Sequence, residues 1–333
     1  MNEAHRRSTG RHEIRYIRYR SYLLHLIIMG TILLLTIVMS RLSTVFCNEY
    51  ALQIYSRLVR SQYFLFGQTS FVFIDLLLLL LALLVLFSLV RLVVLFFTSR
   101  APELRFRFYY RLKKTGLNYA CLLLLLGILF MFFRGILYNR ISFAAANPAS
   151  GNEVSLQEQS EEELTALLST LIDEANDLSG QVEDTAEAFT EDLPARVRAA
   201  MAAAELRYPC LNDVYPKAKK DLTFGITAIS GLPAYASPVT GEVLYRRDAE
   251  AISLPYLLCR ETAALSGYIR SEELSYIAYT ACLSSGDPAL MYSATLCRLN
   301  EVCDELTDRG SYAAEEALTA LNSRPARDLS RIS

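Results

Sequence analysis

Three long apolar runs in the first 140 residues limit what this chain can fold into. Each is close to the roughly 20 residues that a helix needs to cross a hydrocarbon core about 30 Å thick. The runs predict membrane-spanning helices over residues 22–40, 71–98 and 117–138. The first run is long for the apolar part of a cleaved signal peptide, and no small-residue cleavage site follows it. We therefore interpret it as a signal anchor.

Basic residues indicate how these helices are oriented. Arginines and lysines are concentrated in residues 1–21 and 99–116, whereas residues 41–70 contain only three. Under the positive-inside rule, this places the tail and the second loop in the cytoplasm and the first loop outside. Residues 139–160 are then an external linker, and residues 161–333 form an extracytoplasmic domain. The prediction is a multi-pass cell-membrane protein with a cytoplasmic N-terminus.

Charge divides the chain in the same way as hydropathy. Residues 1–140 contain 18 Lys and Arg against 5 Asp and Glu, and the remainder contains 15 against 30. A basic half can indicate nucleic-acid binding, but beside membrane spans it is better explained by topology and by contact with anionic lipid. We therefore expect the lipid bilayer as a partner and no nucleic acid. Asp75, inside the second run, is interpreted as reaching toward the nearer membrane surface.

The outer region is predicted to be mostly helical with a short β element. Ser160 caps a helix over residues 161–178, and Asp192 begins another that stops before Pro209. Alternating apolar residues predict a strand over 222–229, and a shorter strand is expected at 243–245. Four more helices are expected over residues 254–266, 271–284, 287–306 and about 312–322.

The stretch 254–274 is similar to a zinc-peptidase helix that lacks its metal ligands. In the H-E-x-x-H pattern, two histidines on one helix face bind zinc, and the glutamate between them is the general base. Here Glu261 is in the glutamate position, Arg260 replaces the first histidine and Ala264 the second. Glu273 follows on the next helix, where a carboxylate ligand would be expected.

Several short matches in order make the chain resemble one known family, the bacterial three-span membrane proteins of domain of unknown function 3810. In chain order the matches are Tyr215-Pro216-Lys217, Gly231 to Glu242 with its Pro238-Val239-Thr240-Gly241-Glu242 core, Leu254-Pro255, Glu261, Gly267, Glu272-Glu273, Ala278-Tyr279, Ala281-Cys282-Leu283, Asp287-Pro288 and Tyr292-Ser293. The resemblance implies three transmembrane helices followed by an extracytoplasmic, α-rich, zincin-like domain related to gluzincin metallopeptidases.

The same resemblance assigns roles to individual positions. The ligand positions are Arg260, Ala264 and Glu273, and the base position is Glu261. Two of the three ligands are missing, so we expect no bound zinc, no other cofactor and no catalysis. The three histidines all precede residue 26, and Cys259 points about 100° away from position 260 on a helix.

Two hypotheses concern the charges that remain. The Arg260 guanidinium would replace the metal charge and pair with Glu273, so that Arg260→Ala would markedly destabilise the outer domain. Glu242, Glu261 and Glu273 would line the former cleft.

The five outer cysteines, an odd number, are interpreted as buried thiols, with disulfides as the alternative. They are Cys210, Cys259, Cys282, Cys297 and Cys303.

The predicted function is therefore that of a membrane-anchored pseudopeptidase. It would bind an extracytoplasmic peptide or protein, with an extended peptide adding to the strand at 222–229. One alternative is an active zinc peptidase with unusual ligands. Another is a structural partner of a different membrane protein, which would use the spans and the helices of residues 161–206.

Overall fold

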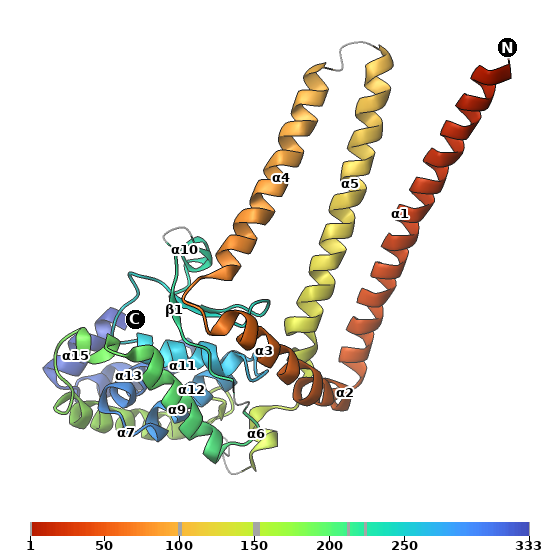
Figure 1. Ribbon diagram of the computed structural model, residues 1–333. Helices are drawn as coiled ribbons and strands as arrows, with labels where there is room; N and C mark the ends of the chain where they lie inside the picture. Colours follow the sequence, from red (N-terminus) through yellow and green to blue (C-terminus); the bar gives the residue numbers. More distant parts are fainter. Residues whose placement is uncertain (1, 99–101, 149–153, 212–213, 223–224, 333) are drawn as a thin grey trace. The chain divides into compact units, whose positions relative to one another are not determined.

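The computed structural model describes residues 2–98, 102–148, 154–211, 214–222 and 225–332 (Figure 1). The chain divides into two compact units. Unit 1 comprises Met1–Phe46 and Leu77–Asn139, and unit 2 comprises Cys47–Leu76 and Arg140–Ser333. Unit 2 therefore includes the segment between the first two apolar runs and the linker, in addition to the predicted outer domain at 161–333.

Unit 1 is built from long apolar helices. They are α1 (Asn2–Leu42), most of α4 (Phe73–Thr98), and α5 (Pro102–Phe130) with its extensions η3 (Met131–Gly135) and η4 (Ile136–Asn139). Among the described residues, three stretches are long and apolar enough to cross a membrane: Ser21–Leu42, Phe73–Val94 and Phe108–Asn139. This finding confirms the three predicted apolar helices.

The basic segments beside the apolar runs are also helical. Helix α1 continues through most of the predicted tail at 1–21, and α5 begins inside the predicted loop at 99–116. Residues 99–101 lie outside the described part of the chain. Many leucines of α1 and α4 are exposed, which suits helices whose solvent is hydrocarbon rather than water.

The first part of unit 2 is an almost continuous helical segment where an outer loop at 41–70 was expected. It consists of α2 (Thr44–Glu49), η1 (Tyr50–Tyr55), α3 (Ser56–Gln62) and η2 (Tyr63–Gly67). Its buried face is apolar and includes Cys47, Tyr50, Ala51, Tyr55 and Val59. The segment therefore belongs to the core of unit 2.

Four helices lead from the linker into the domain. They are α6 (Phe143–Ala146), α7 (Glu161–Ser179), α8 (Glu187–Thr190) and α9 (Leu193–Arg207). Ser160 and Glu163 form a reciprocal capping box at the start of α7, which confirms the predicted cap. Helix α9 has the predicted extent, but Asp192 has a positive φ of 46° and makes no side-chain cap.

A small sheet follows, with strand order β1-β3-β2. Strand β1 (Lys219–Lys220) is parallel to β3 (Val243–Tyr245), and β2 (Ala234–Ala236) is antiparallel to β3. The predicted strand at 243–245 is confirmed. The predicted strand at 222–229 is wrong, because Ile226–Ser230 form the short helix α10, and residues 223–224 lie outside the described part.

Five helices complete unit 2. They are α11 (Leu254–Ala264), α12 (Ser271–Ser284), α13 (Pro288–Asp308), α14 (Ala313–Leu318) and α15 (Ser323–Ile332). Asp287 caps α13 by accepting hydrogen bonds from the amides of Ala289 and Leu290, as its place before Pro288 predicts. The last predicted helix, at about 312–322, is shorter than expected, and α15 was not predicted.

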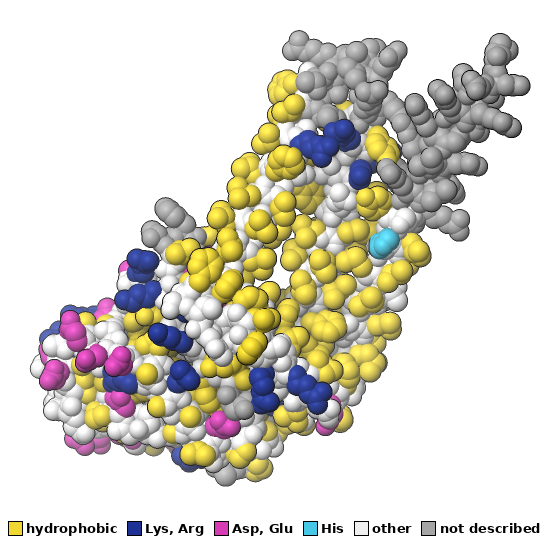
Figure 2. All heavy atoms as spheres, viewed as in Figure 1, with side chains coloured by type: hydrophobic (Ala, Val, Ile, Leu, Met, Phe, Trp, Pro, Cys, Tyr) yellow, Lys and Arg dark blue, Asp and Glu magenta, His cyan; other side chains and the backbone are white. Residues whose placement is uncertain are grey.

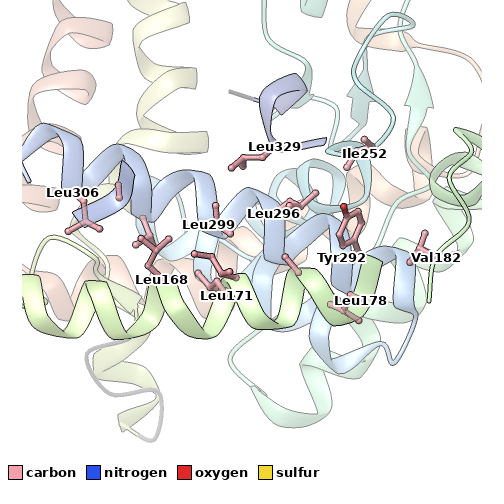
Figure 3. Packing of buried hydrophobic residues seen from close by; sticks show 14 of the residues in the cluster. Leu168, Leu171, Leu178, Val182, Ile252, Tyr292, Leu296, Leu299, Leu306 and Leu329 are labelled. Atoms are coloured by element: carbon pink, nitrogen blue, oxygen red, sulfur yellow. The ribbon is translucent and has the colours of Figure 1, made fainter. Parts of the chain in front are cut away.

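The main apolar core of unit 2 lies between α7 and α13 (Figure 3). Leucines at helical spacing on α7 meet Tyr292, Leu296 and Leu299 of α13. Helix α15 covers this core with Leu329, and its buried Asp328 accepts a hydrogen bond from the Tyr292 hydroxyl at 3.0 Å. Helices α11 and α12 also pack against α13, and these two helices carry the candidate site.

Candidate functional site

Helices α11 and α12 carry the residues that the sequence singles out. Pro255 lies in the first turn of α11, where a missing amide costs nothing, and Gly267 ends the connection with φ at +83°, a conformation that favours glycine. The turn brings the start of α12 back beside α11. Positions 260 and 261 on α11 and position 273 on α12 therefore belong to two helices that pack together.

Glu261 is bonded to the edge of the sheet. Its Oε2 accepts a hydrogen bond from the amide of Ala236 in β2 at 2.8 Å, and its Oε1 lies 3.2 Å from Nη1 of Arg260. The side chain is 13% exposed. Because β2 is an edge strand, the carboxylate occupies a donor that an added strand would need.

Arg260 does not pair with Glu273, contrary to the hypothesis drawn from the sequence. Its Nη1 contacts Glu261, and its Nη2 donates to Oγ of Ser271 at 2.8 Å, at the start of α12. The side chain is 26% exposed. The Arg260 guanidinium is therefore satisfied by the Glu261 carboxylate on its own helix and by the Ser271 hydroxyl.

Glu273 instead holds the linker. Its Oε1 accepts a hydrogen bond from the amide of Phe143 at 2.8 Å and lies 3.4 Å from Nη1 of Arg270. Burial raises the pKa of this carboxyl, and the Phe143 amide and the charges of Arg270 and Arg140 oppose part of that rise. Glu273 therefore fixes the segment that follows the third apolar helix.

The residues in the ligand positions do not fit a zinc ion. Arg260 is a cation without a free electron pair to give, and Ala264 is buried and has no donor atom. Glu273 is the remaining donor, and its Oε1 is already bonded to Phe143. Across the described residues, no three His, Cys, Asp or Glu side chains lie close enough together to hold a metal.

Glu242 does not join Glu261 and Glu273 but serves a different element. It is fully buried, and its two carboxylate oxygens accept hydrogen bonds from the amides of Phe73 and Ile74 at 3.0–3.2 Å. These are the first two amides of α4, which have no partner inside the helix. Glu242 therefore caps the N-terminus of the second apolar helix.

Lys219 completes this arrangement. Its Nζ lies 2.7 Å from Oε1 of Glu242 and donates to the carbonyl oxygens of Phe66 and Phe71 at 2.9 and 2.7 Å. The lysine side chain is 3% exposed. A buried ion pair is tolerable when hydrogen bonds satisfy both partners, and here both ends are used.

The turn before Glu242 is shaped to contact the helical segment at 44–67. Gln62 donates its side-chain amide to the carbonyl oxygens of Pro238 and Val239 at 3.0 and 2.7 Å. Gly241 has φ at +65°, and a Cβ there would lie 3.1 Å from Cβ of Gln62. Conformation and close approach therefore both favour glycine at 241. We call residues 237–242, with Lys219 and Gln62, the tether.

Sequence reasoning identified the Pro238–Glu242 segment but not its task. Lys219, Gln62 and Asp75 were missed as structural residues. Asp75 does not extend freely from the helix but is buried, and its Oδ1 accepts a hydrogen bond from the amide of Ile226 at 3.1 Å. The sequence did contain a signal for the role of Glu242. A glutamate directly after a glycine turn can accept the free amides at the start of a helix from another part of the chain.

The cysteines of unit 2 are free thiols. Cys259 and Cys282, from α11 and α12, are buried with their sulfur atoms 3.6 Å apart. Burial raises the pKa of Cys282 and Cys297, so these thiols stay protonated. Cys210 and Cys303 are half-buried.

Comparison with known proteins places the chain in a family without an assigned role. No curated protein and no solved structure matches the chain. The family described as "Protein of unknown function (DUF3810)" matches residues 50–333, which include all of α4, α5 and the tether and almost all of unit 2. The chain therefore belongs to the DUF3810 family.

Proposed function

We propose that this chain is a membrane-anchored protein whose outward domain is a catalytically inactive relative of zinc peptidases and acts by binding. Its N-terminus would be cytoplasmic and unit 2 would face outward. Support for the orientation comes from the basic residues in 1–21 and 99–116. Support for the anchoring comes from three helices with the length and hydropathy of membrane spans.

One observation supports the inactive interpretation: two carboxylates that an active site would need are bonded to backbone amides instead. A general base must be free to take a proton from water, and a metal ligand must offer an electron pair. Glu261, in the base position, is bonded to the Ala236 amide, and Glu273, in the ligand position, is bonded to the Phe143 amide. Arginine and alanine take the other two positions.

The binding mode first suggested by the sequence needs revision. Residues 226–230 are helical, so the strand expected at 222–229 cannot receive an extended peptide. The edge of β2 remains, but Glu261 already accepts the amide of Ala236 there. A peptide that added to β2 would have to replace this carboxylate with one of its own carbonyl groups.

A structural role beside another membrane protein is the second candidate. The tether favours it, because a buried ion pair and hydrogen bonds from two backbone amides fix the sheet to the first turn of α4.

Metal content and hydrolysis of the full-length protein test the proposal. The full chain is required, because residues 47–76 are part of unit 2. We expect far less than stoichiometric zinc by inductively coupled plasma mass spectrometry in detergent, and no cleavage of unfolded casein with added zinc. Near-stoichiometric zinc that disappears in Glu273→Ala would overturn the inactive interpretation and favour an active peptidase.

A further inference from the structure

An exposed apolar loop lies beside the start of the second apolar helix. The α10 loop, residues 221–222 and 225–233, contains three large apolar side chains that face outward. Leu222 is 52% exposed, Ile229 77% and Leu232 46%. Apolar groups gathered at a loop tip are unfavourable in water, and such patches usually mark a contact surface.

A hydrogen bond holds this loop beside the first turn of α4. The amide of Ile226, the first residue of α10, donates to Oδ1 of Asp75 at 3.1 Å. Asp75 is in the first turn of α4, and the membrane-crossing stretch of that helix begins at Phe73. One helical turn rises about 5 Å, so the loop lies where the chain enters the hydrocarbon region.

Basic side chains hold the base of the same loop. Arg247 donates to the carbonyl oxygen of Asp221 at 3.1 Å, and Arg246 to that of Gly231 at 3.2 Å, so one arginine holds each end. Lys220, next to Asp221, is exposed. Figure 2 shows apolar and basic side chains side by side in unit 2. An apolar tip above a basic base is the arrangement that inserts at a bilayer surface.

We propose that the α10 loop inserts into the lipid leaflet on the domain's own side of the membrane. Ile229, Leu222 and Leu232 would enter the boundary between headgroups and acyl chains. The exposed Lys220 at the base would contact lipid phosphates, whereas Arg246 is already paired with Asp248. The occupant of this surface is therefore phospholipid, not a peptide or a second protein. The inference rests on the membrane anchoring proposed above.

Tryptophan fluorescence can test this directly, because the chain contains no tryptophan. The full-length variants I229W, L83W and Y312W would be reconstituted into vesicles of phosphatidylcholine and phosphatidylglycerol. One set of vesicles has plain acyl chains, a second has acyl chains brominated near the headgroup, and a third has acyl chains brominated near their methyl ends. Leu83 is an exposed residue of α4 within the Phe73–Val94 stretch, and Tyr312 is an 80% exposed residue of unit 2 before α14.

We expect lipid brominated near the headgroup to lower the emission of I229W, and lipid brominated near the chain ends to lower that of L83W, each by about twofold or more. Both lipids should leave Y312W unchanged. Unquenched L83W would refute the membrane anchoring itself. Quenched L83W together with I229W as bright as Y312W would overturn the loop inference alone. A blue-shifted but unquenched I229W would also overturn it, because protein would then cover the loop. L232W repeats the measurement at a second exposed position if I229W folds poorly.

Discussion

The tether and the α11–α12 site both use glutamates to bind backbone amides, but they differ in burial and in charge balance. In the tether, Glu242 is fully buried, bonds two consecutive amides of α4 and has Lys219 as a buried counterion. At the site, Glu261 is partly exposed and bonds one amide, and its cationic neighbour Arg260 is also partly exposed. We infer that the tether is the stronger structural element.

Removing Glu242 should have the largest effect. Glu242→Ala leaves the Lys219 charge buried without a partner and two amides of α4 without acceptors, at a cost of about 3–5 kcal/mol. Thermal unfolding of the full-length protein in detergent measures it. A Lys219→Met, Glu242→Leu double variant should lose less than Glu242→Ala, since no charge is then left unpaired. A small loss for Glu242→Ala would break the comparison.

Glu273→Ala should come second, with a loss of about 1–3 kcal/mol. The buried amide of Phe143 would lose its acceptor, and the linker would lose one of its hydrogen bonds to the start of α12, while the bond from Arg270 to the Arg140 carbonyl remains. Glu272→Ala, one residue earlier on the same helix, is the matched control. Urea unfolding that gave equal losses for the two variants would contradict a specific role of Glu273.

The pKa of Glu273 makes a prediction about pH. Burial raises it above its ordinary value of 4.5, so folding disfavours the charged form. The stabilising contribution of the neutral form is complete below the unfolded pKa and is lost as pH rises through the folded pKa. Glu273→Gln stays neutral, so its unfolding midpoint relative to the wild type should increase with pH across that range. A relative decrease would show that the charged form is stabilised in the fold.

Glu261→Ala should cost about 1 kcal/mol, because one hydrogen bond to a partly exposed carboxylate is lost. The sharper readout is hydrogen exchange at the amide of Ala236, which should become faster. Exchange at Leu244, the β3 partner of Tyr235, is the internal reference. An unchanged Ala236 rate would mean that the carboxylate does not protect the sheet edge.

Arg260→Ala should have the smallest effect, about 0–1 kcal/mol, as expected for a partly exposed ion pair. The hypothesis drawn from the sequence, in which Arg260 pairs with Glu273, predicted a marked destabilisation instead. Arg260→Lys keeps the charge but loses the planar group that reaches Ser271, and it should behave similarly. A loss as large as that of Glu242→Ala would restore the original hypothesis.

Local signals predicted part of this fold well. The capping residue Ser160 and the Asp287-Pro288 pair fixed the starts of α7 and α13, because caps act within one turn. Three apolar runs sufficed for the helices of unit 1, since length and hydropathy decide that question.

Other features depend on distant partners and could not be predicted. The alternating residues at 222–229 suit a strand, but Asp75 and Asp221 accept the amides of Ile226 and Thr227 and stabilise a helix there. Helix α15 is strongly polar, and Tyr292 meets its buried Asp328 from another element. The backbone amides that donate to Glu261, Glu273 and Glu242 likewise lie 25 to 169 positions away in the chain.

The geometry of Gly241 and Glu242 has a consequence for how the family can diverge. Position 264 on α11 holds a buried alanine, so a small apolar residue there is compatible with the fold. A side chain at Gly241 would meet Gln62, and loss of Glu242 would strand a buried lysine. We therefore expect members of the family to keep this Gly-Glu pair even where position 264 varies, so that the tether identifies relatives better than the α11–α12 positions do.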